Sequence, residues 1–476
     1  MRGLDRLREL ELATRPQSPE LEAALARRWE ELPAHVRTPA QMLGRRTAGC
    51  EGTHGVFPRC DLACTPCYHS SDANRVRIDG DHTVREVTAQ MATLRAHRGP
   101  GQNAQLIGGE VTLLAPDDHA AALQAMLHAG RKPMSMSHGD FDYDHLEALA
   151  LDPRTGRPRF THLSFAGHFD SMMFGRRGIR RAAREADLHP YRAAFCQGFA
   201  RLEREHGITS YLAHNMTVTP RNLGQVAEVI EAVHDMGFRM MSFQPAAAVG
   251  NPSRWKEDYD QVTADLVWAE IERGAGARVP FKALQIGDER CNRTGYGAYV
   301  GEKWIPLLDD RVPADHAARD AFVETFGGMD FAAPRRLLAV KLARALAPRP
   351  RAVLTGVRWA GRFARRAGGV RALHADPPRA LTFVMHSFMD ARRVRPAWDA
   401  LQRGERSDDP EIRAAQERLL ACSYAMAHPE SDTLVPACAQ HAVLDPRENV
   451  ALQALLGGQP SSSIKSAIES TIREAR

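Results

Sequence analysis

The sequence predicts an α/β fold in which six strand–helix units build a parallel sheet with crossover helices. Two observations indicate this fold. Short apolar, strand-like runs alternate with longer helix-like segments from about residue 53 to residue 245. The helix-like segments also carry apolar residues at helical spacing. Six such units fit a partial α/β barrel, in which the residues that carry chemistry lie at the C-terminal ends of the strands.

The individual elements follow from local patterns. We expect strands at 53–58, 104–109, 132–139, 161–167, 210–219 and 238–245. We expect helices at 83–97, 117–130, 189–206, 222–236 and 256–273. In the first helix, Thr83 with Glu86 three residues later has the pattern of a capping box. The second helix is rich in alanine and is closed by Gly130.

The rest of the chain divides by composition. We expect a helical N-terminal extension (1–45), the barrel (46–275), a connecting region (276–330), a basic amphipathic segment (331–380) and a C-terminal module of α-rich or α+β type (381–476). The N-terminus is charged throughout and shows no apolar region of a secretory signal. No run of about 18 apolar residues predicts a membrane span. These features predict a cytoplasmic protein.

Three cysteines, Cys60, Cys64 and Cys67, lie in the short stretch RCDLACTPCYHS. With 8 cysteines in 476 residues, the chain is no disulfide scaffold, and clustered thiols in the cytosol indicate metal binding or catalysis. A structural zinc needs four ligands, and His69 is the candidate for the fourth. The spacing C-x3-C-x2-C suits an iron–sulfur cluster better, because such clusters are held by cysteine thiolates at short spacings. Pro66 favours a loop over a helix here.

This C-x3-C-x2-C spacing resembles the signature of the radical S-adenosylmethionine (SAM) superfamily, whose fold is a partial (β/α)6 barrel. The resemblance implies a [4Fe-4S] cluster held by Cys60, Cys64 and Cys67, with SAM bound to the iron that has no protein ligand. It implies that one electron cleaves SAM to methionine and a 5′-deoxyadenosyl radical, which abstracts hydrogen from a substrate C–H bond. Many members carry an aromatic residue before the third cysteine. Here Tyr68 follows it instead and is the candidate for the adenine contact.

A second motif follows the second predicted strand. The triplet Gly108, Gly109 and Glu110 resembles the GGE motif of the same family, which implies that it holds the SAM amino group. Glycines allow a backbone to approach a ligand closely, and a carboxylate pairs with an ammonium group. An ordinary Gly-Gly turn is the alternative interpretation.

The remaining strand ends carry polar candidates. In the fifth strand, Asn215 and Thr217 are candidates for the SAM carboxylate or ribose, and after the sixth strand Gln244 and Asn251 are candidates for SAM or substrate. His168 and Asp170, after the fourth strand, are expected near the pocket mouth, with a structural or capping role as the alternative. The stretch 138–145 carries two histidines and three aspartates, which fit solvated loop carboxylates or a second metal.

Five cysteines lie outside the triplet. Cys196 falls within a helix and is best interpreted as a small core residue. The other four lie in loop-like contexts. An additional iron–sulfur cluster needs about four ligands. The candidates are Cys291, Cys422 and Cys438, with Cys50 as the fourth; buried free thiols are the alternative.

The segment 331–380 is strongly basic, with twelve Lys and Arg against a single acidic residue, Asp376, whereas the whole chain carries a net charge of +5. A helix that turns Val357, Trp359, Ala360 and Phe363 toward an apolar phase would flank them with Arg358, Arg362, Arg365 and Arg366. Such a segment is typical of peripheral membrane contact. A solvated surface helix and a nucleic-acid patch are the alternatives, but no nucleic-acid fold signature is present.

The C-terminal stretches TFVMHSFMDARRV (382–394) and VPACAQH (435–441) resemble those of one branch of the superfamily. That branch contains archaeal tetraether lipid synthases and pterin methyltransferase-like proteins. The resemblance implies an apolar or lipid substrate and an outcome of C–C bond formation or methylation. The dense N-terminal cysteine array of that branch is missing here, and about 50 residues before the barrel are too few for a cobalamin domain.

Two alternatives to a lipid-acting enzyme stay open. One is a radical SAM enzyme that modifies a peptide. The other is an electron-transfer iron–sulfur protein, which predicts fully ligated clusters and no SAM binding. For an enzyme, the expected partners are a small-molecule or lipid substrate and an electron donor such as a ferredoxin or flavodoxin; nucleic acid is not expected.

Overall fold

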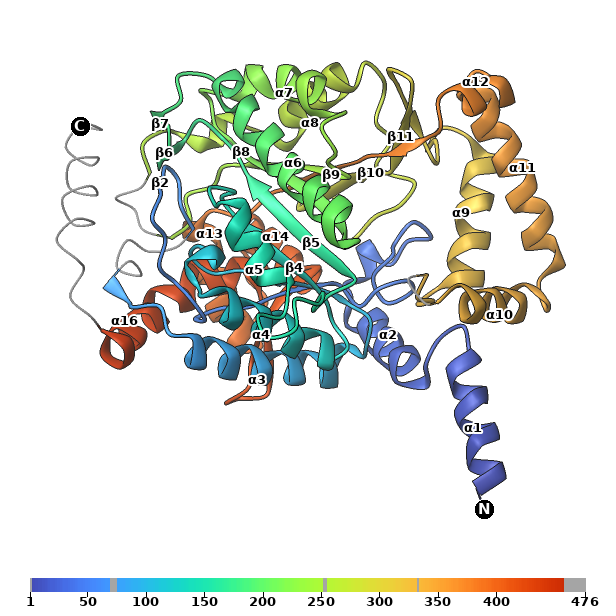
Figure 1. The fold of residues 1–476 in the computed structure, drawn as a ribbon, viewed down its shortest axis with the longest axis horizontal. Coiled ribbons are helices and arrows are strands. Elements are labelled where there is room, and N and C mark those ends of the chain that lie inside the picture. The colour runs from blue at the N-terminus through green and yellow to red at the C-terminus, as the bar shows by residue number, and fades with distance from the viewer. Residues whose placement is uncertain (1, 69–74, 251–254, 332–333, 458–476) are drawn as a thin grey trace.

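The computed structural model describes residues 2–68, 75–250, 255–331 and 334–457 (Figure 1). Its centre is a curled ten-stranded sheet in the order β10-β14-β9-β8-β5-β4-β3-β1-β15-β16. Six adjacent parallel strands form the barrel: β1 (Cys50–Gly52), β3 (Asn103–Leu106), β4 (Lys132–Ser137), β5 (His162–His168), β8 (Thr209–Val218) and β9 (Met240–Pro245). The last five overlap predicted strands in order, and the first lies just before the predicted one. The predicted partial α/β barrel is therefore confirmed.

The later part of the chain extends this sheet at both edges. β14 (Thr382–His386) runs parallel beside β9, and β15 (Tyr424–His428) runs parallel beside β1. β10 (Asn292–Gly295) and β16 (Thr433–Pro436) then pair antiparallel with β14 and β15. Segments predicted as a connecting region and a C-terminal module thus contribute strands to the barrel sheet. They bring the chain around Cys291, Cys422 and Cys438 to the barrel.

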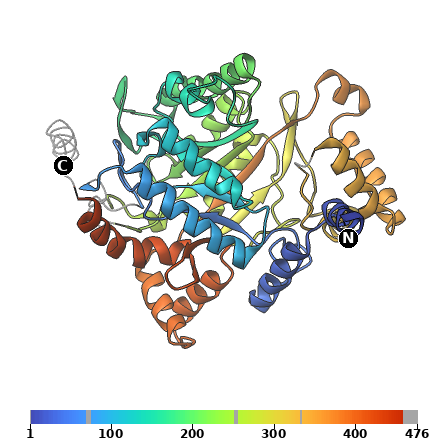
Figure 2. The ribbon, with the colours of Figure 1, turned by 60° about the horizontal axis from the view of Figure 1, so that its bottom comes forward.

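Helices connect the parallel strands and cover the sheet (Figure 2). These are α3 (Gly80–Arg98), α4 (Pro116–His128), α5 (Tyr143–Ala150), α6 (His189–His206), α7 (Val226–Val233) and α8 (Ala264–Ala275). Their inner faces bury side chains such as Met91, Leu94 and Phe199 completely or almost completely against strand residues such as Leu106 and Phe165. Fully burying each of these side chains stabilises the fold by about 1.5–3 kcal/mol.

Three predicted boundaries were wrong. The helix expected from residue 83 begins at Gly80, because the Asp79 side chain accepts from the His82 backbone N–H and caps it. Thr83 therefore lies inside the helix, and its hydroxyl donates to the Val56 carbonyl. The helix expected at 256–273 begins at Ala264, capped by the Thr263 side chain. The first strand lies at Cys50–Gly52, so residues 53–58 form a loop beyond its end.

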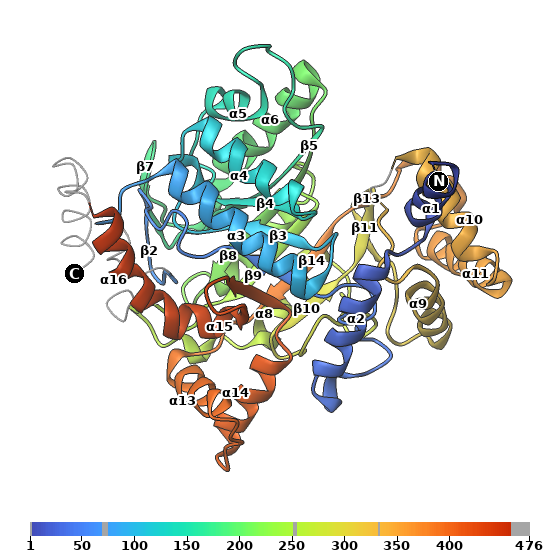
Figure 3. The ribbon, with the colours of Figure 1, turned by 90° about the horizontal axis from the view of Figure 1, so that it is seen from below.

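Two helical groups stand beside the barrel (Figures 1 and 3). The N-terminal extension contains α1 (Arg2–Thr14) and α2 (Pro19–Glu31), as predicted. α1 contacts α10 (Arg335–Leu346). α10 belongs to a group with α9 (Pro313–Phe326), α11 (Pro350–Arg366) and α12 (Val370–Ala375). This group lies next to a small sheet of β11 (Gly297–Val300), β12 (Lys303–Pro306) and β13 (Arg379–Ala380). The C-terminal helices α13 (Ala391–Gln402) and α14 (Pro410–Leu420) form the second group. Within the described ranges, no helix combines the length and apolarity needed to cross a bilayer.

The basic segment does not turn its aromatic residues outward. The Trp359 indole donates to the Leu307 carbonyl (2.7 Å), and Phe363 packs against Val300 and Ile305. Arg362 and Arg366 form ion pairs of 2.8 and 2.6 Å with Asp315 on α9, whose side chain is fully buried. The expected arrangement of Trp359 and Phe363 against an apolar phase is therefore wrong, because α9 and the small sheet already cover that face.

Candidate active site

The fourteen residues predicted for cofactor and metal binding line one cavity of about 260 Å³ in the barrel. They are Cys50, Cys60, Cys64, Cys67, Tyr68, Gly108, Gly109, Glu110, Asn215, Thr217, Gln244, Cys291, Cys422 and Cys438. Residues far apart in the sequence thus meet at one site, as expected where the ends of parallel strands converge.

The loop of the three cysteines follows β1. It is held by a three-stranded sheet of its own, in the order β2-β6-β7, in which β7 is Ile179–Arg181. Cys64 lies in β2 (Ala63–Cys64), which pairs antiparallel with β6 (Met173–Arg176). The Thr65 N–H donates to the Met172 carbonyl (3.1 Å), which extends this pairing. Burial, and then the nearby charge of Glu110, raise the pKa of Cys60 well above its usual value. A thiolate rather than a thiol is the metal ligand, so iron bound here would displace the proton.

The GGE turn packs directly against the start of this loop. The Gly109 N–H donates to the Phe57 carbonyl (2.7 Å), and the Glu110 N–H donates to the Arg59 carbonyl (2.8 Å). A Cβ atom on Gly108 would lie 2.8 Å from the Phe57 ring, and one on Gly109 would overlap the Arg59 carbonyl. The close approach requires glycine at both positions. The two glycines therefore hold the chain immediately before Cys60 in place.

Glu110 joins the GGE turn to the next strand end. Its buried carboxylate accepts from the Thr112 hydroxyl (2.6 Å), the Ser137 hydroxyl (2.8 Å) and the His138 N–H (2.8 Å). The His138 ring in turn bonds to Asp61, the neighbour of Cys60 (2.8 Å). Burial opposes a charge on His138, but the carboxylates of Glu110 and Asp61 outweigh it and raise its pKa. One hydrogen-bonded network thus links the carboxylate at the cavity wall to the cysteine loop.

The ends of β5 and β8 form a second polar group. Asn215 and Thr217 alternate along β8, which places both side chains on one face of the strand. The His168 ring bonds to Asp170 (2.7 Å) and to the Thr217 hydroxyl (3.1 Å). Burial alone would raise the pKa of Asp170, but the His168 bond and backbone N–H donors hold it below its usual value. His168 and Asp170 therefore line the cavity and are also structurally paired.

Two acidic side chains of the loop at 138–145 pair with one arginine. The carboxylates of Asp140 and Asp142 both pair with Arg177, at 2.9 and 2.8 Å. His138 instead lies close to Cys60 and Asp61. Among the described side chains, this stretch therefore does not gather its histidines and aspartates around a common point.

The second set of cysteines comes from four separate segments. Cys50 begins β1, and its N–H donates to the carbonyl of Ser423, the residue after Cys422 (2.7 Å). Cys438 lies on α15 (Ala437–Ala439); burial, and then Cys422 and Cys291, raise its pKa to about 12. Burial likewise raises the pKa of Cys291 to about 11, although Arg418 donates to its sulfur at 3.0 Å. Cys196, by contrast, lies in the core as predicted.

Tyr68 lies at the boundary between the two sets. Its ring contacts Phe388 and His441, with centroid distances of 4.5 and 5.9 Å. Its buried hydroxyl has no hydrogen-bond partner in the part of the chain that the structure describes. A Cβ atom on Gly250 would lie 2.5 Å from the Tyr68 carbonyl, so this backbone also needs a glycine neighbour. His69 and Asn251, two further candidates from the sequence, lie outside the described residues.

Sequence reasoning missed several cavity residues. They are His386, Phe388, Arg418, Tyr424 and His441. The available signal was weak: His386 ends the strand β14, and His441 follows Cys438 by three residues. His441 bonds to Asp445 (2.6 Å) and lies in a π-helical turn (Gln440–Leu444), a rare conformation that is frequent at functional sites.

No family model and no curated protein matches the chain. Several solved structures are similar to it in part, including the following three. SuiB from Streptococcus suis, bound to the precursor peptide SuiA, is 15% identical over 41% of this chain and 38% of its own, with a TM-score of 0.28. Native anSMEcpe with bound AdoMet is 13% identical over 44% of this chain and 55% of its own (TM-score 0.28). The same enzyme with AdoMet and the Cp18Cys peptide is 11% identical over 44% of this chain and 54% of its own (TM-score 0.27). The chain thus matches less than two thirds of each, and similarity this low assigns no function.

Proposed function

We propose that this protein is a radical SAM enzyme. Cys60, Cys64 and Cys67 hold a [4Fe-4S] cluster, and SAM binds at the open iron beside the turn 108–110. The observation that carries the proposal is the meeting of the three-cysteine loop, the GGE turn and the polar strand ends in one cavity. When bound, the cluster and SAM supply a 5′-deoxyadenosyl radical that abstracts hydrogen from the substrate.

The residues of the cavity suit this ligand. Glu110 presents a buried carboxylate, oriented by three donors, for the SAM ammonium group. Asn215, Thr217 and Gln244 offer donors and acceptors for the SAM carboxylate and ribose. The buried Tyr68 hydroxyl lacks a partner among the described residues and offers one more polar contact on the adenine side.

We further propose a second iron–sulfur cluster, held by Cys291, Cys422 and Cys438 with Cys50 as the fourth ligand. Its support is that the four cysteines line the same cavity although they come from three regions far apart in the sequence, around residues 50, 291 and 422–438. Arg418 lies against the Cys291 sulfur and would offset the negative charge of ligated thiolates.

The proposed substrate is apolar, with a lipid as the favoured class and C–C bond formation or methylation as the outcome. Flexible, apolar side chains line the wall of the cavity: Met134, Met136, Met173, Met240, Phe388 and Met389. Methionine packs adaptably against irregular apolar surfaces. A ferredoxin or flavodoxin is the proposed electron donor.

The proposed membrane contact keeps Val357 from the face of α11 first expected but excludes Trp359 and Phe363, which pack inward. Val353, Leu354 and Val357 are exposed there at 48%, 51% and 65%, and Arg358 and Arg365 are exposed as well. Apolar side chains flanked by arginines favour a peripheral contact with an anionic membrane surface.

Deuterium transfer tests the function directly. The anaerobically reconstituted, reduced protein is incubated with SAM and with deuterated candidates from two classes, long-chain lipids and peptides. We expect deuterium in 5′-deoxyadenosine with a lipid. Deuterium transfer only from peptides would replace the lipid proposal with the peptide-modifying alternative. Absence of SAM cleavage would favour the electron-transfer protein.

A further inference from the structure

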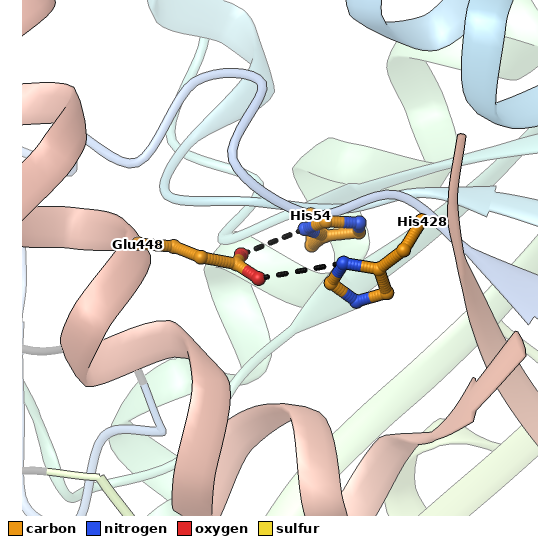
Figure 4. Close-up of side chains that lie close together, drawn as sticks. All are labelled: His54, His428 and Glu448. Carbon is orange, nitrogen blue, oxygen red and sulfur yellow. Dashed lines mark hydrogen bonds and ion pairs between the residues drawn. The ribbon is translucent and has the colours of Figure 1, made fainter. Parts of the chain in front are cut away.

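Three side chains that do not line the cavity lie close together (Figure 4). His54 follows β1, His428 ends β15, and Glu448 lies on α16 (Asp445–Leu456). The His54 Nδ1 atom is 2.8 Å from one Glu448 oxygen, and the His428 Nδ1 atom is 3.7 Å from the other. The two imidazole rings stack with their centroids 4.3 Å apart. The side chains of His54 and His428 are only 10% and 7% exposed.

The outer ring nitrogens define the tautomer of both histidines. The His54 Nε2 atom lies 2.7 Å from the Ala427 carbonyl, which can only accept a hydrogen bond. The His428 Nε2 atom lies 2.7 Å from the Gln440 side-chain oxygen. The orientation of that amide follows from its nitrogen, which donates to carboxylate oxygens of Asp445 and Glu448, both at 2.9 Å. Both Nε2 atoms therefore carry the hydrogen.

In the neutral rings, both Nδ1 atoms consequently present a lone pair to carboxylate oxygens. Glu448 faces both of them, and Glu430 approaches the His428 Nδ1 at 3.1 Å. A nitrogen lone pair and a negatively charged carboxylate oxygen repel each other unless a positive charge lies between them. A proton on His54 alone would pair that ring with Glu448 but would leave the His428 lone pair facing Glu430 and Glu448. Protonating both rings would stack two imidazolium ions of like charge face to face. A single divalent cation would satisfy both lone pairs and the carboxylates without that repulsion.

We propose that His54, His428 and Glu448 bind a divalent transition metal, with zinc as the favoured ion. Two imidazole nitrogens and one carboxylate make a His2Glu donor set, which binds zinc in proteins with a solvent molecule in the fourth position. Metal-bound histidines usually donate their second ring N–H to a carbonyl or carboxylate oxygen, and both histidines do so here.

The position of the site indicates a structural role. The Gln90 side chain fixes the His54 backbone, because it accepts from the His54 N–H (3.1 Å) and donates to the His54 carbonyl (2.9 Å). The metal would therefore tie α16 and the end of β15 to the start of the loop that leads to Cys60. Metal that binds only the folded site contributes its binding free energy to stability.

Zinc content and its loss in matched variants test this site. The reconstituted protein, with its cysteines occupied by iron, is stripped of loosely bound metal, loaded with zinc, desalted and assayed for zinc and iron. We expect about one zinc per chain at this site. Glu448→Gln and His428→Gln should lose it and keep their iron. In Glu448→Gln, the new amide can still donate to the His54 Nδ1, so the variant is expected to fold.

His206→Gln is the matched control, because His206 lies near Glu147 and Glu205 in a more exposed cluster that has a single imidazole. It should keep its zinc. Cobalt substitution supplies a second readout: visible bands of N and O ligation without thiolate charge transfer. Zinc retained in Glu448→Gln, no zinc in the parent protein, or a cobalt–thiolate spectrum would overturn the proposal. None of these outcomes depends on SAM cleavage, so the proposed function is tested separately.

Discussion

The two cysteine sets of this protein reach the same cavity by different routes. Cys60, Cys64 and Cys67 lie within eight residues on one loop. Cys50, Cys291, Cys422 and Cys438 span almost the whole chain and meet only because β10 and β15 lie in the same sheet as β1. The chain itself holds the first set together, whereas the fold assembles the second. Changes to local chemistry and changes to the fold should therefore affect the two sets differently.

The largest expected effect comes from removing the local set. Changing Cys60, Cys64 and Cys67 together to alanine should abolish SAM cleavage, because no cluster with an open iron remains. The dispersed set should still retain about four irons if it holds its own cluster. Formation of 5′-deoxyadenosine by the reduced protein and iron content per chain measure the two effects. Undiminished cleavage would contradict the assignment, and complete loss of iron would show that the two sets do not act separately.

Removing the dispersed set is the reciprocal experiment. Cys422→Ser with Cys438→Ser should lose about four irons and keep SAM cleavage, because the first cluster retains its three ligands. Turnover of the substrate should fall. Cys196→Ala is the control, since this buried core thiol lies outside the cavity, and its iron content should not change. If the double variant contains as much iron as the parent protein, these cysteines do not hold a second cluster.

Glu110→Gln sharpens the comparison within the local set. Loss of a charge-assisted bond of about 1.5–3 kcal/mol should lower SAM affinity roughly ten- to a hundredfold, with iron content unchanged. The amide would also present hydrogens to some of the donors around Glu110, so stability should fall by about 1–3 kcal/mol. Titration calorimetry and urea unfolding separate the two effects.

Glu51→Gln is the matched control for Glu110→Gln. Glu51 is a buried carboxylate that pairs with Arg131 at 2.8 Å and does not line the cavity. The Glu51→Gln variant should have a lower free energy of unfolding than the parent protein and the same affinity for SAM. Equal SAM affinity in Glu110→Gln and the parent protein would show that the GGE triplet acts only as a turn.

The same contrast between local pattern and tertiary partner applies to Asp315. Asp315→Asn should lower the free energy of unfolding by about 1.5–3 kcal/mol, because Arg362 and Arg366 lose their shared carboxylate. Burial alone would raise the pKa of Asp315, but the Asp309 N–H and the two arginines hold it below its usual value. This stabilisation is therefore fully present above the usual carboxyl range and is lost as pH falls through the lowered pKa. Urea unfolding of both proteins from neutral to acid pH should show a difference that persists at neutral pH and closes only in strong acid.

The smallest effect is expected at the membrane face of α11. Changing Arg358 and Arg365 to glutamine should weaken binding to anionic vesicles by about 1 kcal/mol per arginine at low salt, and high salt should abolish the binding. Arg362→Gln is the control, because this arginine pairs with Asp315; it should lower stability more than vesicle binding. The measurement is co-sedimentation with vesicles. If the protein stays in the supernatant with anionic vesicles at low salt, the proposed membrane contact is wrong.

The sequence by itself determined five of the six barrel strands, their order and the cysteine loop, and it placed the first strand a few residues too late. These features depend on short-range patterns: alternating elements, fixed cysteine spacing and a glycine pair at a strand end. Boundaries were less certain, because a single capping residue such as Asp79 or Thr263 moves a helix start by several residues. The order of the strands was predicted correctly because consecutive strands of this part of the sheet are also neighbours in space.

Only the tertiary structure decided which distant segments meet. No periodic pattern shows that β15 pairs with β1, since their residues lie more than 370 positions apart: Cys50 faces Tyr424. The pattern of α11 was equally ambiguous, because an amphipathic helix packed on α9 has the same spacing as one that lies on a bilayer. Asp315 resolves that ambiguity for Arg362 and Arg366, and it does so through contacts made only in the folded chain. Local spacing is set by covalent geometry, whereas partners far along the chain are selected by the packing of the whole sheet.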